Sequence, residues 1–242
     1  KLIYWLKLLW FIHIFEKLSM ESLSLEIETP HRSLANIAAD SIRVSIIRKE
    51  LKMGQPLTEA ALSQALEISK TPVREALSLL KSEGLVVSET HKGYKVFTMG
   101  QQELVQFCEL RFALESQALR YGVQRDHSEL TRKLEYILES MADSLGELER
   151  EKYLSLDTKF HRAFFEVCGN RFLSKHYDSI SSVIEAMRHY ISNTGQATQT
   201  SMKGHKLLVE KIANGNSEEA VSLLEEHIVN WSRRACLETS FS

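Results

Sequence analysis

Two pairs of aspartate and histidine side chains have a spacing that suits metal binding. Asp157 and His161 lie four residues apart, so one face of a helix would present both, along the border of its apolar stripe. Polar groups placed there need partners once they are buried, and Asp and His one turn apart can also chelate a metal ion. A local Asp–His ion pair or a solvated helix edge is the simpler interpretation of this pair taken alone.

The second pair comes from two helices near the C-terminus. His205 precedes Gly215 by ten residues, and His227 follows it by twelve. In antiparallel helices these separations correspond to about 15 and 18 Å, so the two imidazoles are expected at nearly the same height. Two Asp/His groupings at inward positions together favour a metal site over a local ion pair.

The segment SKTPVREAL, from Ser69 to Leu77, indicates a different chemistry. Thr71 is a suitable helix cap and Pro72 a suitable first helical residue. Apolar residues then recur at helical spacing and give one inward face. The polar side chains remain at the exposed N-terminus of the helix, where free N–H groups and the helix dipole favour phosphates and base edges. The residues expected to face DNA here are Ser69, Lys70, Thr71 and Arg74.

The residues around this segment predict a winged helix-turn-helix. A short amphipathic helix over 58–66 and a brief turn precede the basic helix, which Gly84 ends. Strands that begin at 85–87 and return over 94–98 form a hairpin. The turn of this wing carries Lys92 and Gly93, which are also expected to face DNA. An ordinary helix pair with a hairpin is the alternative, but the full order of elements favours a DNA-binding domain.

The stretch PLTEAALSQALEISKTPVREALSLLKSEGLV, from Pro56 to Val86, resembles the DNA-binding domain of the GntR family of bacterial transcription regulators. The resemblance covers roughly residues 33–98. It implies that Lys70 and Arg74 contact the operator and that Gly93 lets the wing approach the minor groove. Lys70 stands where these proteins often carry Arg, which unlike Lys makes a two-pronged contact to guanine.

Length and charge allow two domains with different partners. The chain has 242 residues, of which 43% are hydrophobic and 26% charged, enough for packed cores. Residues 31–99 hold ten Lys and Arg against seven Asp and Glu, whereas residues 100–242 hold seventeen against twenty-one. The basic part therefore coincides with the DNA-binding pattern. The three cysteines are isolated, which suits the reducing cytoplasm.

The first thirty residues form an N-terminal extension of different character. Leu2 to Phe15 is an apolar run that is too short to span a membrane, and it lacks the cleavage site of a signal peptide. We therefore expect no membrane partner. One hypothesis is that the native chain starts at Met20, so that residues 1–19 are not native. An interfacial or packing helix is the alternative.

Residues 100–242 are expected to form an antiparallel α-helical bundle, which makes the chain mostly α. A polar loop is expected at 193–200 and a tight turn at 214–216. Periodicity predicts six helices, over roughly 101–124, 128–148, 150–168, 170–193, 201–214 and 217–237.

This second domain resembles the FCD effector domain of the FadR-like GntR regulators, in its compact six-helix form. The resemblance rests on the segment DTKFH that ends at His161, on Gly169-Asn170, on His205, and on the segment from Ala220 to His227. It implies four metal ligands, Asp157, His161, His205 and His227. Three imidazoles and one carboxylate suit Zn, Ni, Mn or Fe. The position before the third ligand is usually acidic and is Gly204 here.

The FCD resemblance also implies a small organic acid as effector. Four protein ligands leave one or two metal positions open, which a carboxylate can fill, and Arg111 and Arg188 are candidates to pair with that carboxylate. The expected function is a cytoplasmic, homodimeric transcription regulator that binds a near-palindromic DNA operator and responds to the acid. A regulator that senses the metal alone is the alternative. A metalloenzyme is a third reading, against which the sequence offers no positioned general base or nucleophile.

Overall fold

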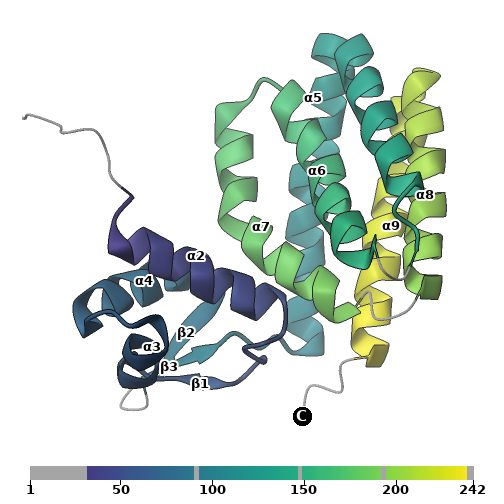
Figure 1. The fold of residues 1–242 in the computed structure, drawn as a ribbon. Coiled ribbons are helices and arrows are strands. Elements are labelled where there is room, and N and C mark those ends of the chain that lie inside the picture. The colour runs from purple at the N-terminus through teal and green to yellow at the C-terminus, as the bar shows by residue number, and fades with distance from the viewer. Residues whose placement is uncertain (1–31, 90–92, 147–148, 192–194, 239–242) are drawn as a thin grey trace, which may run out of the picture. The chain divides into compact units, whose positions relative to one another are not determined.

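The structure is a computed structural model that describes residues 32–89, 93–146, 149–191 and 195–238 (Figure 1). It divides the chain into two units, residues 1–33 and residues 34–242. Both the hypothesis on residues 1–19 and the predicted wing residue Lys92 lie outside the described residues. No helix among the described residues is long and apolar enough to cross a membrane.

The predicted winged helix-turn-helix is present and has two elements that the sequence did not predict. Helix α2 (Leu34–Ile47) packs on α4 (Lys70–Ser82), and α3 (Glu59–Leu66) completes the helical layer. The short strand β1 (Pro56–Leu57) joins the predicted hairpin of β2 (Val86–Glu89) and β3 (Gly93–Val96), in the antiparallel order β1-β3-β2. Helix α2 and strand β1 are the unpredicted elements. The register pairs Leu57 with Tyr94 and Val86 with Val96.

Local signals fix the ends of α3 and α4. Thr58 caps α3, since its hydroxyl accepts a hydrogen bond from the Ala61 N–H at 3.1 Å. Helix α4 has Ser69 at its N-cap, so the expectation that Thr71 caps this helix is wrong. The expectation that Pro72 is the first helical residue is also wrong, because α4 begins at Lys70. As the third residue it still lies in the first turn, where its missing N–H costs no hydrogen bond. Gly84 ends the helix as predicted, with a φ of 77° and a bond from Leu85 N–H to Leu80 C=O.

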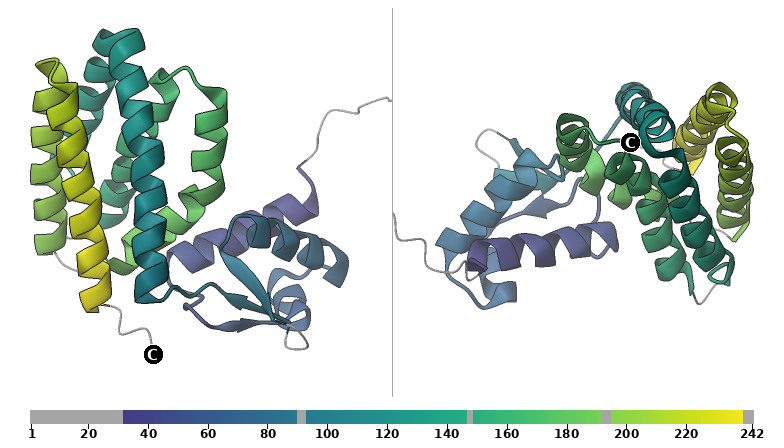
Figure 2. Two further views of the ribbon diagram at one scale, coloured as in Figure 1. Left: turned by 180° about the vertical axis from the view of Figure 1, so that it is seen from behind. Right: turned by 90° about the horizontal axis from the view of Figure 1, so that it is seen from above.

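The second half of the chain is a bundle of α5 (Gln101–Ala142), α6 (Arg150–Val167), α7 (Arg171–Ile191), α8 (Gly195–Ala213) and α9 (Ser217–Glu238). Figure 2 shows α8 and α9 side by side next to α5, in agreement with their contacts. The two helices predicted over 101–148 form one element bent at Asp126, which has φ −153° and ψ 75°. The Asp126 carboxylate accepts the Glu129 N–H at 3.0 Å and so caps the second segment.

The polar loop predicted at 193–200 is wrong for the residues from Gly195 onward, which belong to α8. Their Gln and Thr content suggested a loop, but Ala197 and Thr198 are buried. The Tyr153 hydroxyl on α6 donates a hydrogen bond to the Thr198 C=O at 3.3 Å. Tertiary contact therefore outweighs the low intrinsic helix propensity of this segment.

Two tight turns set the heights of the helices that carry the Asp and His residues. Gly169 has a φ of 60°, and the Asn170 side chain accepts the N–H groups of Phe172 and Leu173, which starts α7. The predicted turn at 214–216 is confirmed, with Gly215 at a φ of 75° and a bond from Asn216 N–H to Lys211 C=O. It places α8 and α9 antiparallel and adjacent.

Candidate metal centre and nucleic-acid interface

Four side chains from three helices converge inside the bundle. Asp157 and His161 come from α6, His205 from α8 and His227 from α9, and we call these four residues the Asp/His cluster. One nitrogen or carboxylate oxygen from each lies within 4.8 Å of the others. The ring centroids of His205 and His227 are 4.6 Å apart, so the two rings face each other at the same height, as the helix geometry predicted.

The hydrogen bonds of His161 define which ring nitrogen faces the cluster. Its Nδ1 lies 2.7 Å from Glu115 Oε2, and its Nε2 lies 3.3 Å from Arg111 Nη2. Because arginine can only donate, Nε2 must be the acceptor, and Nδ1–H must donate to Glu115. Nε2, which accepts from Arg111 in this structure, is thus the ring nitrogen that faces the cluster, with Nε2 of His205 3.4 Å away.

Asp157 is held as an ionised carboxylate in a buried position. Burial raises its pKa, but the Arg188 charge and then His205 and His161 outweigh burial and lower the pKa to about 2. Its Oδ2 lies 2.5 Å from Arg188 Nε, and its Oδ1 lies 3.4 Å from His205 Nε2. One oxygen is thus engaged by the arginine, while the other faces the imidazoles.

The buried imidazoles are neutral. Burial, followed by the charges of Arg111 and Arg188, holds the pKa of His161 well below its usual value. Burial also lowers the pKa of His205 to about 4, despite the opposing charge of Asp157. Neutral imidazole is the form that binds metal ions. Nδ1 of His205 is buried and has no hydrogen-bond partner among the described residues.

These donors fit a divalent transition metal. Imidazole nitrogens and a single carboxylate are ligands for Zn, Ni, Mn or Fe. The Nδ1–H bond from His161 to Glu115 is the kind of outer contact that orients a metal-binding imidazole. A metal ion held here would involve Asp157, His161, His205 and His227.

Both arginines proposed from the sequence lie beside the Asp/His cluster. Arg111 and Arg188 are only 1% and 3% exposed. Arg111 Nε donates to Glu115 Oε1 at 2.7 Å, and Arg188 Nη1 donates to Thr158 at 2.8 Å. Nη2 of Arg188 is buried without a hydrogen-bond partner among the described residues.

Glu115 is the residue that sequence reasoning missed. It is fully buried and joins Arg111 to His161. The signal was available in its spacing, because it lies four residues after Arg111 and shares the inward stripe of α5 with Cys108 and Leu119.

A cavity of about 170 Å³ lies between α8 and α9 and borders the cluster at His227. The FCD resemblance implied an acidic residue at position 204, where this chain has glycine. A Cβ at this position would lie 3.1 Å from His227 Nδ1, so glycine lets α8 approach the ring. The cavity is lined by Thr200, Ser201, Gly204, Leu207, Leu223, Glu226 and His227.

The residues predicted to face DNA lie together at the exposed start of α4. Ser69, Lys70, Thr71 and Arg74 all have exposed side chains there. Gly93 begins β3 with a φ of 86°, a conformation that glycine adopts without strain. Arg74 is paired with Glu59 of α3 through two hydrogen bonds of 2.8 and 2.7 Å.

Comparison with known proteins supplies the family. Residues 34–96 match the bacterial regulatory proteins of the gntR family, and residues 106–230 match the FCD domain. The chain belongs to the GntR family and carries an FCD domain. This regulator is 30% identical to the Nta operon transcriptional regulator of Aminobacter aminovorans, over 72% of its own chain and 81% of that protein.

Further relatives are also transcription regulators. The probable D-xylose utilization operon transcriptional repressor of Paenarthrobacter nicotinovorans is 26% identical, over 81% of this chain and 86% of that one. E. coli McbR/YncC has the same fold, with a TM-score of 0.68 at 20% identity over 83% and 95% of the two chains. The metal-free FCD domain of TM0439 gives 0.52 at 23% identity, over 58% and 96%. This GntR regulator is therefore a DNA-binding transcription regulator and not an enzyme.

Replacing Glu115 should weaken metal binding. Glu115→Gln removes the charge that receives the His161 Nδ1–H, and loss of such a contact lowers metal affinity about 10–100-fold. Titration of the full chain with Zn²⁺ or Mn²⁺ against a competing chelator measures this. Glu109→Gln, an exposed change on the same helix, is the matched control. Unchanged affinity in a folded Glu115→Gln protein would contradict the assigned role.

The metal-free protein should lose stability as the pH falls below about 6.5. The unfolded state binds protons on histidine below that pH, whereas the folded state resists until the lowered pKa of His205, about 4. The stability is therefore present above pH 6.5 and is lost on acidification, by on the order of 3 kcal/mol for His205 alone. Urea unfolding across this range tests it, and His205→Gln should give a flatter dependence than the parent.

Proposed function

We propose that this GntR regulator binds its operator as a homodimer through α4, and that a small organic acid controls that binding at a metal site. The DNA-binding domain would comprise residues 31–99, and residues 100–242 would bind the acid and form the dimer. Two copies of α4 would enter successive major grooves, about 34 Å apart, which suits a near-palindromic operator. Arg74, Lys70, Ser69 and Thr71 would contact DNA from α4, and Lys92 and Gly93 from the wing.

The charge balance around the Asp/His cluster is the observation that carries the proposal. The positive charges of Arg111 and Arg188 match the negative charges of Glu115 and Asp157, and the buried imidazoles are neutral. A divalent cation added to this set would leave a surplus of positive charge in a buried site, which is costly unless it is paired. One carboxylate group bound beside the ion would halve this surplus, and two carboxylate groups would cancel it.

Two further features support a small anion as the effector. The buried Nη2 of Arg188 has hydrogen-bonding capacity that no described residue uses, and arginine is well suited to carboxylates. The adjoining cavity of about 170 Å³ is smaller than the pockets that hold drug-sized ligands, and so favours a compact acid. The relative named as a probable repressor of a D-xylose utilization operon is in keeping with a small-molecule signal.

Helix α7 offers a route from this site to the DNA-binding domain. Arg188 contacts Asp157, and Tyr190, two residues further on, accepts a hydrogen bond from the Met53 N–H at 2.9 Å. On the same helix, the Ser182 hydroxyl donates to Glu83, which follows α4. An acid that changed the contacts of Arg188 would shift this helix, provided that it bound the two arrangements with different affinity.

Replacing Arg74 should weaken operator binding without harming the FCD domain. Arg74→Ala removes a cationic group expected to contact a base edge, a contact typically worth about 1–3 kcal/mol. The duplex that the parent protein selects from a random-sequence library serves as the operator probe, and fluorescence anisotropy gives the affinity. Metal content should stay unchanged. Operator binding as tight as that of the parent would exclude Arg74 as a DNA contact.

Replacing His227 should separate control from DNA binding. His227→Ala removes one imidazole, so the metal and the response to acids should be lost while non-specific DNA binding remains. Operator affinity of the metal-loaded parent is measured with and without a panel of small mono-, di- and tricarboxylates. No change with an acid that binds by calorimetry would exclude acid control. A response to the metal alone, in carboxylate-free buffer, would favour the metal-sensing alternative.

A further inference from the structure

The guanidinium of Arg74 is paired side-on with the carboxylate of Glu59. Arg74 Nε donates to Oε1 at 2.8 Å and Nη2 donates to Oε2 at 2.7 Å, which links the start of α3 to the N-terminal part of α4. Glu59 is the first residue of α3 and is partly covered, with 24% of its side chain exposed. The Arg74 side chain is 65% exposed. Glu59 thus lies against the two helices, and the Arg74 side chain extends from them into solvent.

The donors that remain on Arg74 have the geometry of a base contact. Arginine has five N–H donors, and the side-on pair uses only Nε–H and one Nη2–H. The end of the guanidinium, with Nη1 and the second Nη2–H, presents two parallel donors. This is the arrangement that binds O6 and N7 of guanine in the major groove. The ion pair therefore occupies the edge of Arg74 that base recognition does not need.

We propose that Glu59 is a positioning residue for base recognition, which holds Arg74 so that its end-on donors face one base pair of the operator. The inference rests on the proposed DNA contact of Arg74 and goes beyond it, since it assigns sequence selectivity to a residue that bears the wrong charge for DNA. An arginine on a free stem can swing to any nearby phosphate. A fixed arginine loses less freedom when it meets the correct base.

The charge of Glu59 makes this proposal separable from a simple electrostatic role. A carboxylate near the DNA-facing end of α4 repels phosphates and reduces the attraction exerted by Lys70 and Arg74. Removing it should strengthen binding to any DNA if repulsion were its whole effect. If it positions Arg74, removal should instead lower the preference for the operator over other DNA. Repulsion alone therefore predicts an unchanged preference for the operator over random DNA, whereas a positioning role predicts that the preference falls.

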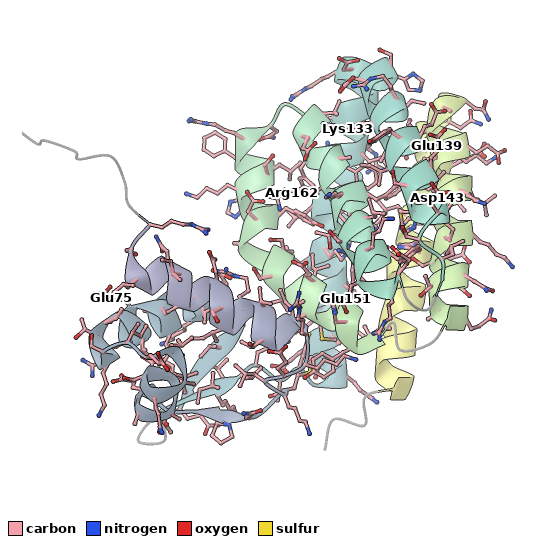
Figure 3. The ribbon with its side chains drawn as sticks, in the orientation of Figure 1. Glu75, Lys133, Glu139, Asp143, Glu151 and Arg162 are labelled. Atoms are coloured by element: carbon pink, nitrogen blue, oxygen red, sulfur yellow. The ribbon has the colours of Figure 1, made fainter. Side chains whose placement is uncertain are left out.

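The test uses the full chain and two duplexes of equal length and composition, the selected operator and a scrambled sequence. The measured quantity is the dissociation constant for the scrambled duplex divided by that for the operator, so a larger ratio means a stronger preference for the operator. Glu59→Ala should lower this ratio about tenfold, with equal or tighter binding to the scrambled duplex. Glu75→Ala is the control, because it removes the same charge from the neighbour of Arg74 on α4, at the periphery of the helix-turn-helix (Figure 3). It should leave the ratio unchanged.

Two further measurements identify the cause. A repeated selection with Glu59→Ala should lose its base preference at the same base pair as a selection with Arg74→Ala. In an Arg74→Ala background, Glu59→Ala should have no further effect on the ratio. Equal tightening on both duplexes, with the preference intact, would overturn the positioning role while leaving Arg74 as a DNA contact. An Arg74→Ala protein with parental operator affinity would instead contradict the DNA contact itself.

Discussion

The ion pair between Asp157 and Arg188 constrains the rest of the FCD domain. Both groups are buried, and neither charge could remain there alone, because an unpaired buried charge costs several kcal/mol. Arg111 and Glu115 form a second such pair on α5, and His161 links it to the first. The inward faces of α5, α6 and α7 are therefore fixed to one another by charge as well as by apolar packing. The consequence is a connected polar centre, in which breaking one ion pair leaves a buried charge unpaired unless another group replaces the lost partner.

The remaining helices contribute differently to this centre. Helices α8 and α9 bring the imidazoles of His205 and His227, which enter the site without the penalty of a full charge, and the Ser201 hydroxyl of α8 donates to Asp157. Their placement depends on the turn at Gly215, which sets the heights of His205 and His227, and on Gly204, whose missing side chain leaves room for the His227 ring. The charged side chains of the site thus come from α5, α6 and α7, and the imidazoles of α8 and α9 complete it. The cluster could therefore bind a metal ion, because imidazole nitrogens and one ionised carboxylate lie at the same place.

The sequence predicted what depends on local spacing. Helical periodicity and the glycine turn predicted the pairs Asp157/His161 and His205/His227, and the FCD resemblance implied that the four residues form one site. Cap and turn residues outlined the winged helix-turn-helix. Helix α2 has buried apolar residues at helical spacing, a local signal that the prediction left out, whereas the two-residue strand β1 exists through its pairing with β3. The start of α8 was mistaken for a loop because burial of Ala197 and Thr198 is a tertiary effect. Glu115 was missed because a charged residue on an apolar stripe is normally exposed, and only its partners explain its burial.

The two ion-pair systems of this regulator suit opposite tasks. The pair between Glu59 and Arg74 lies at the surface, where such pairs contribute at most about 1 kcal/mol to the stability of the fold, so its task is to orient the arginine. The buried pairs are expensive to break, so only a ligand that replaces the lost charge partner can rearrange them. A bound anion meets that condition at Arg188, which lies two residues from the Tyr190 contact with Met53. Strong buried electrostatics would then give the FCD domain its selectivity for a charged signal, while the exposed pair orients Arg74 and leaves its end-on donors for a base.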